Sequence, residues 1–296
     1  MANKTAFVTG GASGIGRAVA EMLANRGVRV AIVDLNLSAA QTVAESLPGG
    51  QAIAVSADVA NWDSQLSAFK QVLAEVGGRV DYVFGIAGIG ERTWIPNNPA
   101  GTEFAKPDLA ALEVDLNGAL YTAALAIQQM RRQEPSSDGF RGKIALAASI
   151  CGFYCVPSQY LNFKMPSSLK LTAPALPIYT AAKHGVVGFV RSFGHHLPVE
   201  QISLNAICPG VVKTSISTAA FYDMMEERKL LVPIADVVAA FEQCLDSDIS
   251  GETIEIEPRS GVIVRAGLEP LNQDAAETLA VLKLRGAPLH APAAQF

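Results

Sequence analysis

Thr9-Gly10-Gly11-Ala12-Ser13-Gly14-Ile15-Gly16 joins a short apolar run, residues 5–9, to a segment with helical spacing that begins at Ile15. A glycine-rich loop between a strand and a helix predicts a dinucleotide site. Glycines adopt positive φ angles and allow close backbone approach, and the first turn of a helix offers unpaired N–H groups to a pyrophosphate. The alternative is that the glycines only form a tight turn. The candidate cofactor-contacting residues of this loop are Gly10, Ser13, Gly14, Ile15 and Gly16.

The rest of the chain repeats this alternation of strand and helix. Short apolar runs predict strands over residues 5–9, 28–34, 52–56, 80–86, 143–148, 203–207 and 253–257. Helical spacing predicts helices over residues 15–26, 38–47, 62–76, 109–132, 179–197 and 234–245. Right-handed crossovers place such helices on both faces of a parallel sheet. The expected fold is therefore α/β, a doubly wound parallel sheet of about seven strands, in one domain over residues 1–266.

The composition excludes several classes of protein. The chain has 296 residues, 50% of them hydrophobic and 17% charged, which is enough for one large core. The net charge is −5 and the Lys and Arg residues are scattered, so we expect no nucleic-acid partner. The four cysteines show neither metal-ligand spacing nor the density of a disulfide framework. With no leader sequence and no apolar stretch long enough to span a bilayer, we expect a cytoplasmic protein without metal or membrane partner.

Asp34 ends the second expected strand, 18 residues after Gly16. A carboxylate at this position accepts hydrogen bonds from the ribose hydroxyls of NAD and repels the 2′-phosphate of NADP. Neither Ser13 nor Leu35 offers a compensating cation, so the predicted cofactor is NAD. Asp58 and Val59 close the third strand and are candidates to bracket the adenine. Asp58 could equally be a helix-capping residue.

Tyr179 and Lys183 stand four residues apart, so a helix would place them one turn apart on the same face. A nearby ammonium favours phenolate and lowers the pKa of a tyrosine from its ordinary value of about 10, which suits acid–base catalysis. The spacing alone is weak evidence, but apolar residues continue the helical pattern after Lys183. Ser149 ends the fifth strand, where ligands of such sheets bind. A serine there could instead form a turn.

Together, Gly10-x-x-x-Gly14-x-Gly16 and Tyr179-x-x-x-Lys183 resemble the signatures of the classical short-chain dehydrogenase/reductase family, over about residues 4–258. The resemblance implies a Rossmann fold, with Tyr179 as the acid/base and Lys183 lowering its pKa and binding the nicotinamide ribose. It implies that Ser149 holds the substrate oxygen, and that the chain forms a homodimer or homotetramer through its long helices. Further cofactor contacts implied by the family pattern are Ala87, Gly88, Pro209, Gly210, Val212 and Thr214. Thr214 could also be a simple helix cap.

Three features depart from the family pattern. Gly85-Ile86 stands where the family has two asparagines, which removes amides that tie the sheet to the cofactor floor. Asp115 replaces the family's fourth catalytic residue, an asparagine, and remains a candidate for the proton relay from Lys183. Ser149 and Tyr179 are 30 residues apart, and removing residues 160–176 restores the family register. This insertion is expected to form a wall of the substrate pocket, or to be a surface loop or a retained intron.

These patterns predict an NAD-dependent oxidoreductase that transfers a hydride between a hydrophobic secondary alcohol or ketone, such as one of secondary metabolism, and the nicotinamide. The expected lid, residues 215–231, carries Phe221, Tyr222, Met224 and Met225, which suit a bulky apolar substrate or the core face of a helix. Residues 267–296 are expected to form a C-terminal extension. Two alternatives stay open: a non-redox dehydration, isomerisation or cyclisation on the same fold, and a non-catalytic NAD-binding protein.

Overall fold

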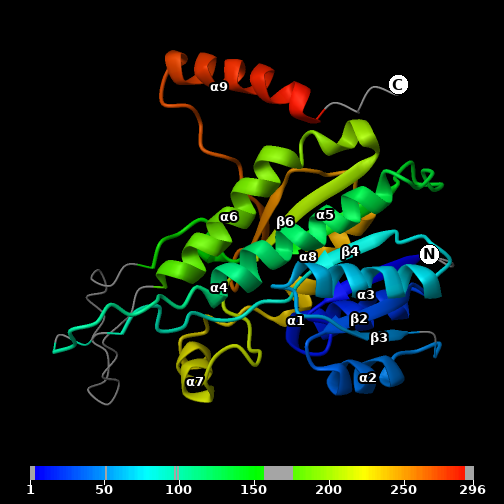
Figure 1. Cartoon of the computed structure of the whole chain (residues 1–296), viewed down its shortest axis with the longest axis horizontal. Coiled ribbons are helices and arrows are strands. Elements are labelled where there is room, and N and C mark those ends of the chain that lie inside the picture. Colours follow the sequence, from blue (N-terminus) through cyan, green and yellow to red (C-terminus); the bar gives the residue numbers. More distant parts are fainter. Residues whose placement is uncertain (1–3, 51, 97, 99, 157–175, 291–296) are drawn as a thin grey trace. The chain divides into compact units, whose positions relative to one another are not determined.

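The computed structural model describes residues 4–50, 52–96, 98, 100–156 and 176–290. In these residues an eight-stranded sheet runs in the order β3-β2-β1-β4-β5-β6-β7-β8 (Figure 1). Its strands are β1 Thr5–Thr9, β2 Arg29–Asp34, β3 Ile53–Ser56, β4 Tyr82–Gly85, β5 Gly142–Ala147, β6 Ile202–Pro209, β7 Thr253–Glu257 and β8 Gly261–Val264. All neighbours pair in parallel except β7 and β8, which are antiparallel. The strand order reverses between β1 and β4, and open α/β sheets bind ligands beyond the strand ends at such a reversal.

Helices cover both faces of this sheet (Figure 1). The α-helices of the described residues are α1 Gly14–Asn25, α2 Leu37–Ser46, α3 Trp62–Glu75, α4 Ala110–Leu112, α5 Gly118–Met130, α6 Pro177–Phe193, α7 Ala219–Glu227, α8 Ile234–Asp246 and, outside the unit that contains the sheet, α9 Gln273–Gly286. A π-helical turn, η1 Glu113–Asn117, separates α4 from α5. The 3₁₀ turns are η2 Ile150–Gly152, η3 Leu197–Glu200 and η4 Ala287–His290. The doubly wound α/β fold expected from the sequence is confirmed.

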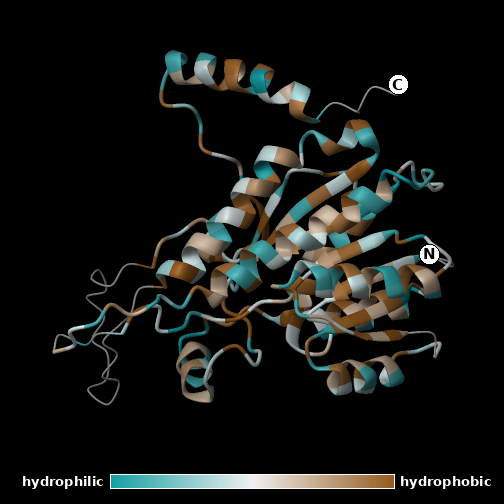
Figure 2. Cartoon of the chain, viewed as in Figure 1, coloured by the Kyte–Doolittle hydropathy of each residue, from teal (hydrophilic) through white to brown (hydrophobic). Residues whose placement is uncertain are grey.

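Successive residues of the strands feed two separate apolar cores, because side chains alternate between the faces of a sheet. Phe7 belongs to the core under α3, α5 and α6, where its ring lies 5.0 Å from that of Phe69. Its neighbours Ala6 and Val8 belong to the core under α1, α2 and α8. Figure 2 shows the resulting pattern, with largely hydrophobic strands inside and helices that carry polar residues outside. Burial of each such large side chain contributes roughly 1.5–3 kcal/mol.

The turn from β1 into α1 depends on two glycines. Gly10 has a φ of 67°, which glycine adopts without strain. A Cβ atom on Gly16 would lie 2.1 Å from the carbonyl oxygen of Gly10, so any larger residue would push α1 away from the loop. The glycine spacing therefore lets the first turn of α1 sit directly on the end of β1.

One strand and one helix of the sheet-containing unit differ clearly from the sequence-based expectation. Strand β8 was not expected, because its four residues follow β7 after a tight turn and were too few to form a pattern of their own. The helix expected over residues 109–132 is interrupted by η1, which widens one turn and turns Asp115 into the protein interior. The stretch Ala110–Met130 is long and apolar enough to cross a membrane by length and composition, but half of it is buried in the fold, as in the core helices of α/β proteins.

The chain divides into two compact units, Met1–Arg265 and Ala266–Phe296. The first contains the whole sheet with α1 to α8. The second contains α9, a regular helix capped by Asn272, whose side chain accepts a hydrogen bond from the amide of Ala275. Helix α9 buries none of its residues. The expected insertion, residues 160–176, lies outside the described residues except for Leu176.

Candidate active site

Four candidate catalytic residues come together at the carboxyl end of β5. Lys183 Nζ, on α6, lies 3.1 Å from Asp115 Oδ2 on η1. It also donates a hydrogen bond of 3.0 Å to the carbonyl oxygen of Ala147, the last residue of β5. The same nitrogen lies 5.4 Å from the centre of the Tyr179 ring. The Ser149 side chain lies close enough to the Tyr179 phenol to lower its pKa. Residues from three separate segments thus form one cluster.

Burial dominates the electrostatics of this cluster. Burial raises the pKa of Tyr179, the Lys183 cation and the Ser149 side chain lower it, and Asp115 raises it again, leaving a net increase. Burial lowers the pKa of Lys183, but the Asp115 and Tyr179 anions outweigh it and hold this pKa above its ordinary value. Lys183 lowers the pKa of Tyr179, as expected. The expected net decrease of that pKa is wrong, because burial outweighs the effect of Lys183. Its ammonium is already paired with a buried carboxylate, so less of its field is left for the phenol.

Ser149 reaches Tyr179 because η2 packs tightly on α6. A Cβ atom on Gly152 would lie 2.9 Å from the carbonyl oxygen of Lys183 and 2.7 Å from Val187 Cγ2. Only glycine allows this approach. Ser149 is also the N-cap of η2, and its side chain accepts a hydrogen bond of 3.2 Å from the amide of Cys151 in that turn. The alternative that Ser149 forms a turn is therefore also correct, because the same side chain caps η2.

The glycine-rich loop meets two other predicted cofactor residues. A Cβ atom on Gly10 would lie 2.7 Å from Ala87 Cα, and one on Gly14 would lie 3.2 Å from Thr214 Cγ2. Thr214 also contacts the hydroxyl of Tyr222 at 3.3 Å. The loop after β1, the end of β4 and the segment before α7 therefore meet at one place. Thr214 is not a helix cap, because the N-cap of α7 is Thr218.

The remaining predicted cofactor residues lie along the same edge of the sheet. Asp34 ends β2, and its carboxylate accepts hydrogen bonds from the amides of Ala12, at 3.2 Å, and Asn36, at 3.0 Å. Val59 is buried and its carbonyl accepts a hydrogen bond from Gln65. Ser13 is the N-cap of α1, and Ile15 and Gly16 lie in its first turn. The other predicted residues lie at or after strand ends: Gly88 after β4, Pro209 at the end of β6, and Gly210 and Val212 after β6.

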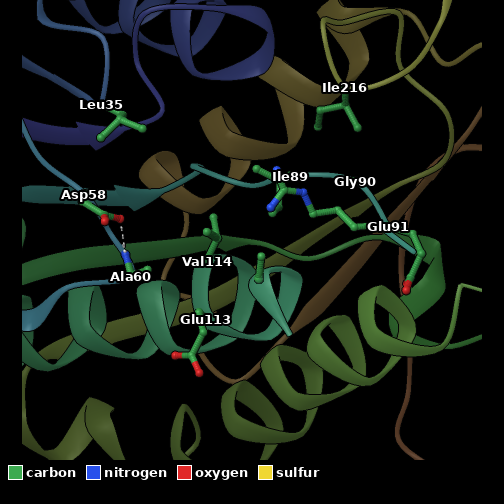
Figure 3. Close-up of a pocket in the computed structure, with 11 residues that line it drawn as sticks. Leu35, Asp58, Ala60, Ile89, Gly90, Glu91, Glu113, Val114 and Ile216 are labelled. Atoms are coloured by element: carbon green, nitrogen blue, oxygen red, sulfur yellow. Dashed lines mark hydrogen bonds between the residues drawn. The ribbon is translucent and has the colours of Figure 1, made fainter. Parts of the chain in front are cut away.

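A cavity of about 600 Å³ extends along this edge. Leu35, Asp58 and Ala60 lie at one end of it, and Ile89, Gly90 and Glu91 at the other (Figure 3). The other residues that line it are Arg92, Ala110, Glu113, Val114 and Ile216. Asp58 accepts a hydrogen bond of 2.9 Å from the amide of Ala60, whereas the N-cap of α3 is Asn61. The alternative reading of Asp58 as the helix cap is therefore wrong.

These residues fit a nicotinamide dinucleotide. Gly10, Gly11 and Gly14 of the loop carry no side chain, and α1 begins at the end of the loop. An acidic residue closes β2 beside this loop. Lys183 donates one of its three N–H groups to the Ala147 carbonyl and forms an ion pair with Asp115, which leaves donor capacity for a ligand oxygen. The set provides donors for phosphate, an acceptor for ribose and a cation near the strand ends. Among the described residues, no group of three or more His, Cys, Asp or Glu side chains could hold a metal ion.

Comparison with known proteins identifies the family. The family model for short chain dehydrogenases matches residues 4–161 and 167–224. The chain belongs to this family. Short-chain dehydrogenase/reductase prx7 of Penicillium rubens is 30% identical over 266 residues, which are 84% of this chain and 86% of that protein. The 15-hydroxyprostaglandin dehydrogenase (NAD+) of Homo sapiens is 32% identical over 219 residues, 72% of this chain and 70% of its own.

The short-chain dehydrogenase fold is equally clear from solved structures. A short-chain type dehydrogenase/reductase from Mycobacterium marinum superposes with a TM-score of 0.71, covering 87% of this chain and 95% of its own, at 23% identity. Cofactor use differs among the sequence relatives. The NADP-dependent dehydrogenase clz5 of Cochliobolus lunatus is 28% identical over 85% of this chain and 87% of its own. The family is thus one of nicotinamide-dependent oxidoreductases that act on small molecules, and its members do not share one cofactor.

Three functional contacts in this short-chain dehydrogenase were not expected from sequence. Thr9 Oγ1 accepts hydrogen bonds from the amides of Ile86, at 3.1 Å, and Ala87, at 3.3 Å, so a hydroxyl ties the cofactor floor where the family's asparagines are missing. The Ala147 carbonyl holds Lys183, and Glu91 contacts the backbone of Tyr179. The position of Thr9, directly before the glycine run, could have indicated its role. No sequence signal marks the other two.

Proposed function

We propose that this protein is an NAD-dependent oxidoreductase that interconverts a hydrophobic secondary alcohol and its ketone, with Tyr179 as the acid/base. The observation that carries the proposal is the cluster of Ser149, Tyr179, Lys183 and Asp115 at the carboxyl end of β5. A hydroxyl pair and a buried cation at one point suit proton transfer to or from a substrate oxygen. The non-catalytic alternative gives no reason for all four side chains to converge, and net reduction of NAD by the substrate distinguishes the redox reaction from the non-redox alternative.

The chemistry follows from the positions of these side chains. Ser149 and Tyr179 donate or accept hydrogen bonds at the substrate oxygen, which lies within reach of both hydroxyls. Tyr179 accepts the alcohol proton during oxidation and returns it during reduction. Lys183 stabilises the phenolate that forms, and Asp115 keeps Lys183 charged inside the protein. A nicotinamide bound along the strand ends supplies the hydride acceptor or donor.

The choice of NAD rests on Asp34. Its carboxylate is held beside the glycine loop by the amides of Ala12 and Asn36, so its charge faces the position of an adenosine ribose. The next residue, Leu35, lines the cavity and is 72% exposed, and it offers no cation for a 2′-phosphate. The NAD-dependent human relative supports this choice, and the NADP-dependent fungal relative makes a direct comparison of the two cofactors necessary.

A hydrophobic substrate is supported by helix α7. Of its residues only Tyr222 is buried. Phe221, Met224 and Met225 remain partly exposed, so they are not the core face that the sequence left as an alternative. Flexible methionines beside an aromatic ring suit the wall of an apolar pocket. We further expect a cytoplasmic homodimer or homotetramer, which light scattering and cell fractionation test.

The decisive experiment measures NADH formation by the purified protein with NAD and a panel of steroid, lipid and polyketide-like secondary alcohols, repeated with NADP. We expect turnover of at least one alcohol with NAD. Tyr179→Phe should lose about 10²–10⁴-fold in kcat, the usual contribution of a general acid–base residue, while its circular dichroism stays unchanged. Full turnover of Tyr179→Phe would refute the proposed mechanism. Stoichiometric NAD binding without turnover of any alcohol would favour the non-catalytic alternative.

A further inference from the structure

Glu91 contacts the catalytic helix at the residue that carries the phenol. Its Oε2 atom accepts a hydrogen bond of 2.7 Å from the backbone amide of Tyr179, although the two residues are 88 positions apart. Tyr179 is the third residue of α6, and the N-cap residue of that helix, Leu176, provides no side-chain cap. A remote loop thus supplies the cap that the local sequence lacks.

The contact stabilises a turn that would otherwise be weakly held. The first four amides of a helix have no partner within the helix, and helix ends open more readily than their centres. A carboxylate at this end also interacts favourably with the helix dipole. Because Tyr179 lies within this first turn, opening of the turn would move the phenol away from Ser149 and Lys183. The position of the acid/base is therefore sensitive to the Glu91 contact.

The loop that carries Glu91 also holds the other half of the cluster. Two residues earlier, the amide of Ile89 donates a hydrogen bond of 2.8 Å to Asp115 Oδ1, and Asp115 pairs with Lys183. Ile89 and Glu91 both line the cavity, as Figure 3 shows. One short loop after β4 thus fixes Lys183 through Asp115 and Tyr179 through its amide. The spacing between cation and phenol depends on this loop.

We propose that Glu91 is a positioning residue, which holds Tyr179 in place for proton transfer without touching the reacting atoms. The proposal rests on the function proposed above for Tyr179. The second carboxylate oxygen, Oε1, is enclosed and has no hydrogen-bond partner among the described residues. A buried oxygen without a partner is destabilising, so other interactions must keep the carboxylate there. The Tyr179 amide and the helix dipole are the interactions that hold the carboxylate in this place.

Three substitutions separate the components of this role. Glu91→Leu removes the acceptor, whereas Glu91→Gln keeps an oxygen that can accept from the Tyr179 amide and removes only the charge. Glu91→Ala also lacks the acceptor and introduces a smaller side chain than leucine. It replaces Glu91→Leu if that variant does not fold. Glu45→Leu and Glu45→Gln, on the exposed side of α2, are matched controls that leave the cluster untouched.

Two measurements test the proposal, steady-state kinetics and hydrogen exchange of the peptide that contains the first turn of α6. In Glu91→Leu we expect kcat to fall at least about 10-fold, equivalent to 1.4 kcal/mol, with KM for NAD and alcohol within about 3-fold of wild type. The Tyr179 amide should exchange at least about 10-fold faster, while the rest of α6 is unchanged. Glu91→Gln should keep most of the wild-type kcat and most of the protection of the Tyr179 amide from exchange. The Glu45 variants should match wild type in both.

Other outcomes overturn the proposal. A raised KM with unchanged kcat in Glu91→Leu would make Glu91 a ligand contact instead, with Oε1 as its acceptor. Unchanged exchange at Tyr179 in both Glu91→Leu and Glu91→Ala would exclude the positioning role. Exchange does not depend on turnover, so this readout still decides the proposal if the wild-type protein oxidises no alcohol, an outcome that would count against the proposed function alone.

Discussion

Asp115 Oδ2 lies 3.1 Å from Lys183 Nζ, and the two side chains are 1% and 4% exposed. The family has an asparagine in place of Asp115, so this chain adds a buried negative charge at the catalytic centre. The carboxylate keeps the lysine charged and also opposes formation of phenolate at Tyr179. The pair therefore affects both the stability of the fold and the pH dependence of the proposed reaction.

Asp115→Asn should shift the pH dependence of alcohol oxidation toward acid. Asp115 is one of the groups that raise the pKa of Tyr179, so removing its charge lowers that pKa. Oxidation needs the phenolate, and the rate therefore rises with pH through this pKa. We expect the rising limb of kcat/KM to move to lower pH. A limb that stays in place, or moves toward alkali, would contradict this account.

Lys183→Met should destabilise the fold by about 3–5 kcal/mol, because it leaves Asp115 as a buried charge without its partner. The double variant Lys183→Met/Asp115→Asn should recover more than about 1 kcal/mol of this loss, since the amide oxygen still accepts from Ile89. Urea unfolding measures both values. The pKa of Lys183 is raised on folding, so the pair stabilises below the ordinary value of 10.5 and the effect is lost as pH rises above it. Additive effects of the two substitutions would argue against coupling.

Gly152→Ala should impair catalysis, whereas Gly188→Ala should not. An alanine at position 152 would press against the Lys183 carbonyl and Val187, and move Ser149 away from Tyr179. We expect a cost of about 1–3 kcal/mol and at least about a 10-fold lower kcat. At Gly188, on the same helix, no described atom lies within 4 Å of a new Cβ, and the variant should be about 0.5–1 kcal/mol more stable. Equal kcat values for the two variants would exclude the packing argument.

Asp34→Ala/Leu35→Arg should change the cofactor preference from NAD to NADP. The first change removes the carboxylate that repels a 2′-phosphate, and the second places a cation at an exposed position beside it. The ratio of kcat/KM for NADP over NAD should rise at least about 10-fold. Leu35→Arg alone is the control and should gain less, because Asp34 is still present. A ratio that both variants leave unchanged would mean that Asp34 does not select the cofactor.

Thr9→Val should weaken the cofactor floor, and Thr9→Ser should not. The valine leaves the partly buried amides of Ile86 and Ala87 without their hydroxyl acceptor, at a cost of about 1 kcal/mol. NAD affinity should fall with stability, measured by calorimetry and urea unfolding. The serine keeps the acceptor and should stay within about 0.5–1.5 kcal/mol of wild type. If Thr9→Val is as stable as wild type and Thr9→Ser is not, the methyl group of Thr9 matters and the hydroxyl does not.

The fold was predictable because its signals are local. Each strand buries a short apolar run and each helix buries one stripe, so the period of the apolar residues reveals both. Strand β8 escaped because four residues after a turn carry too little pattern. Tyr179, Lys183 and Asp34 could also be selected as candidates from the sequence, since glycine spacing and a four-residue interval are properties of neighbouring residues.

Contacts between distant segments depended on tertiary packing. The sequence indicated Ser149 and Tyr179 but not how they meet across 30 residues, which the approach of Gly152 to α6 decides. Asp115 was a candidate in sequence, yet only the π turn brings its carboxylate to Lys183 and makes an ion pair where the family has an amide. Glu91 and Thr9 act through backbone amides of other segments, and such partners leave no spacing in the sequence. Local periodicity specifies the elements, whereas the packing of distant elements sets the charges and distances at the candidate site.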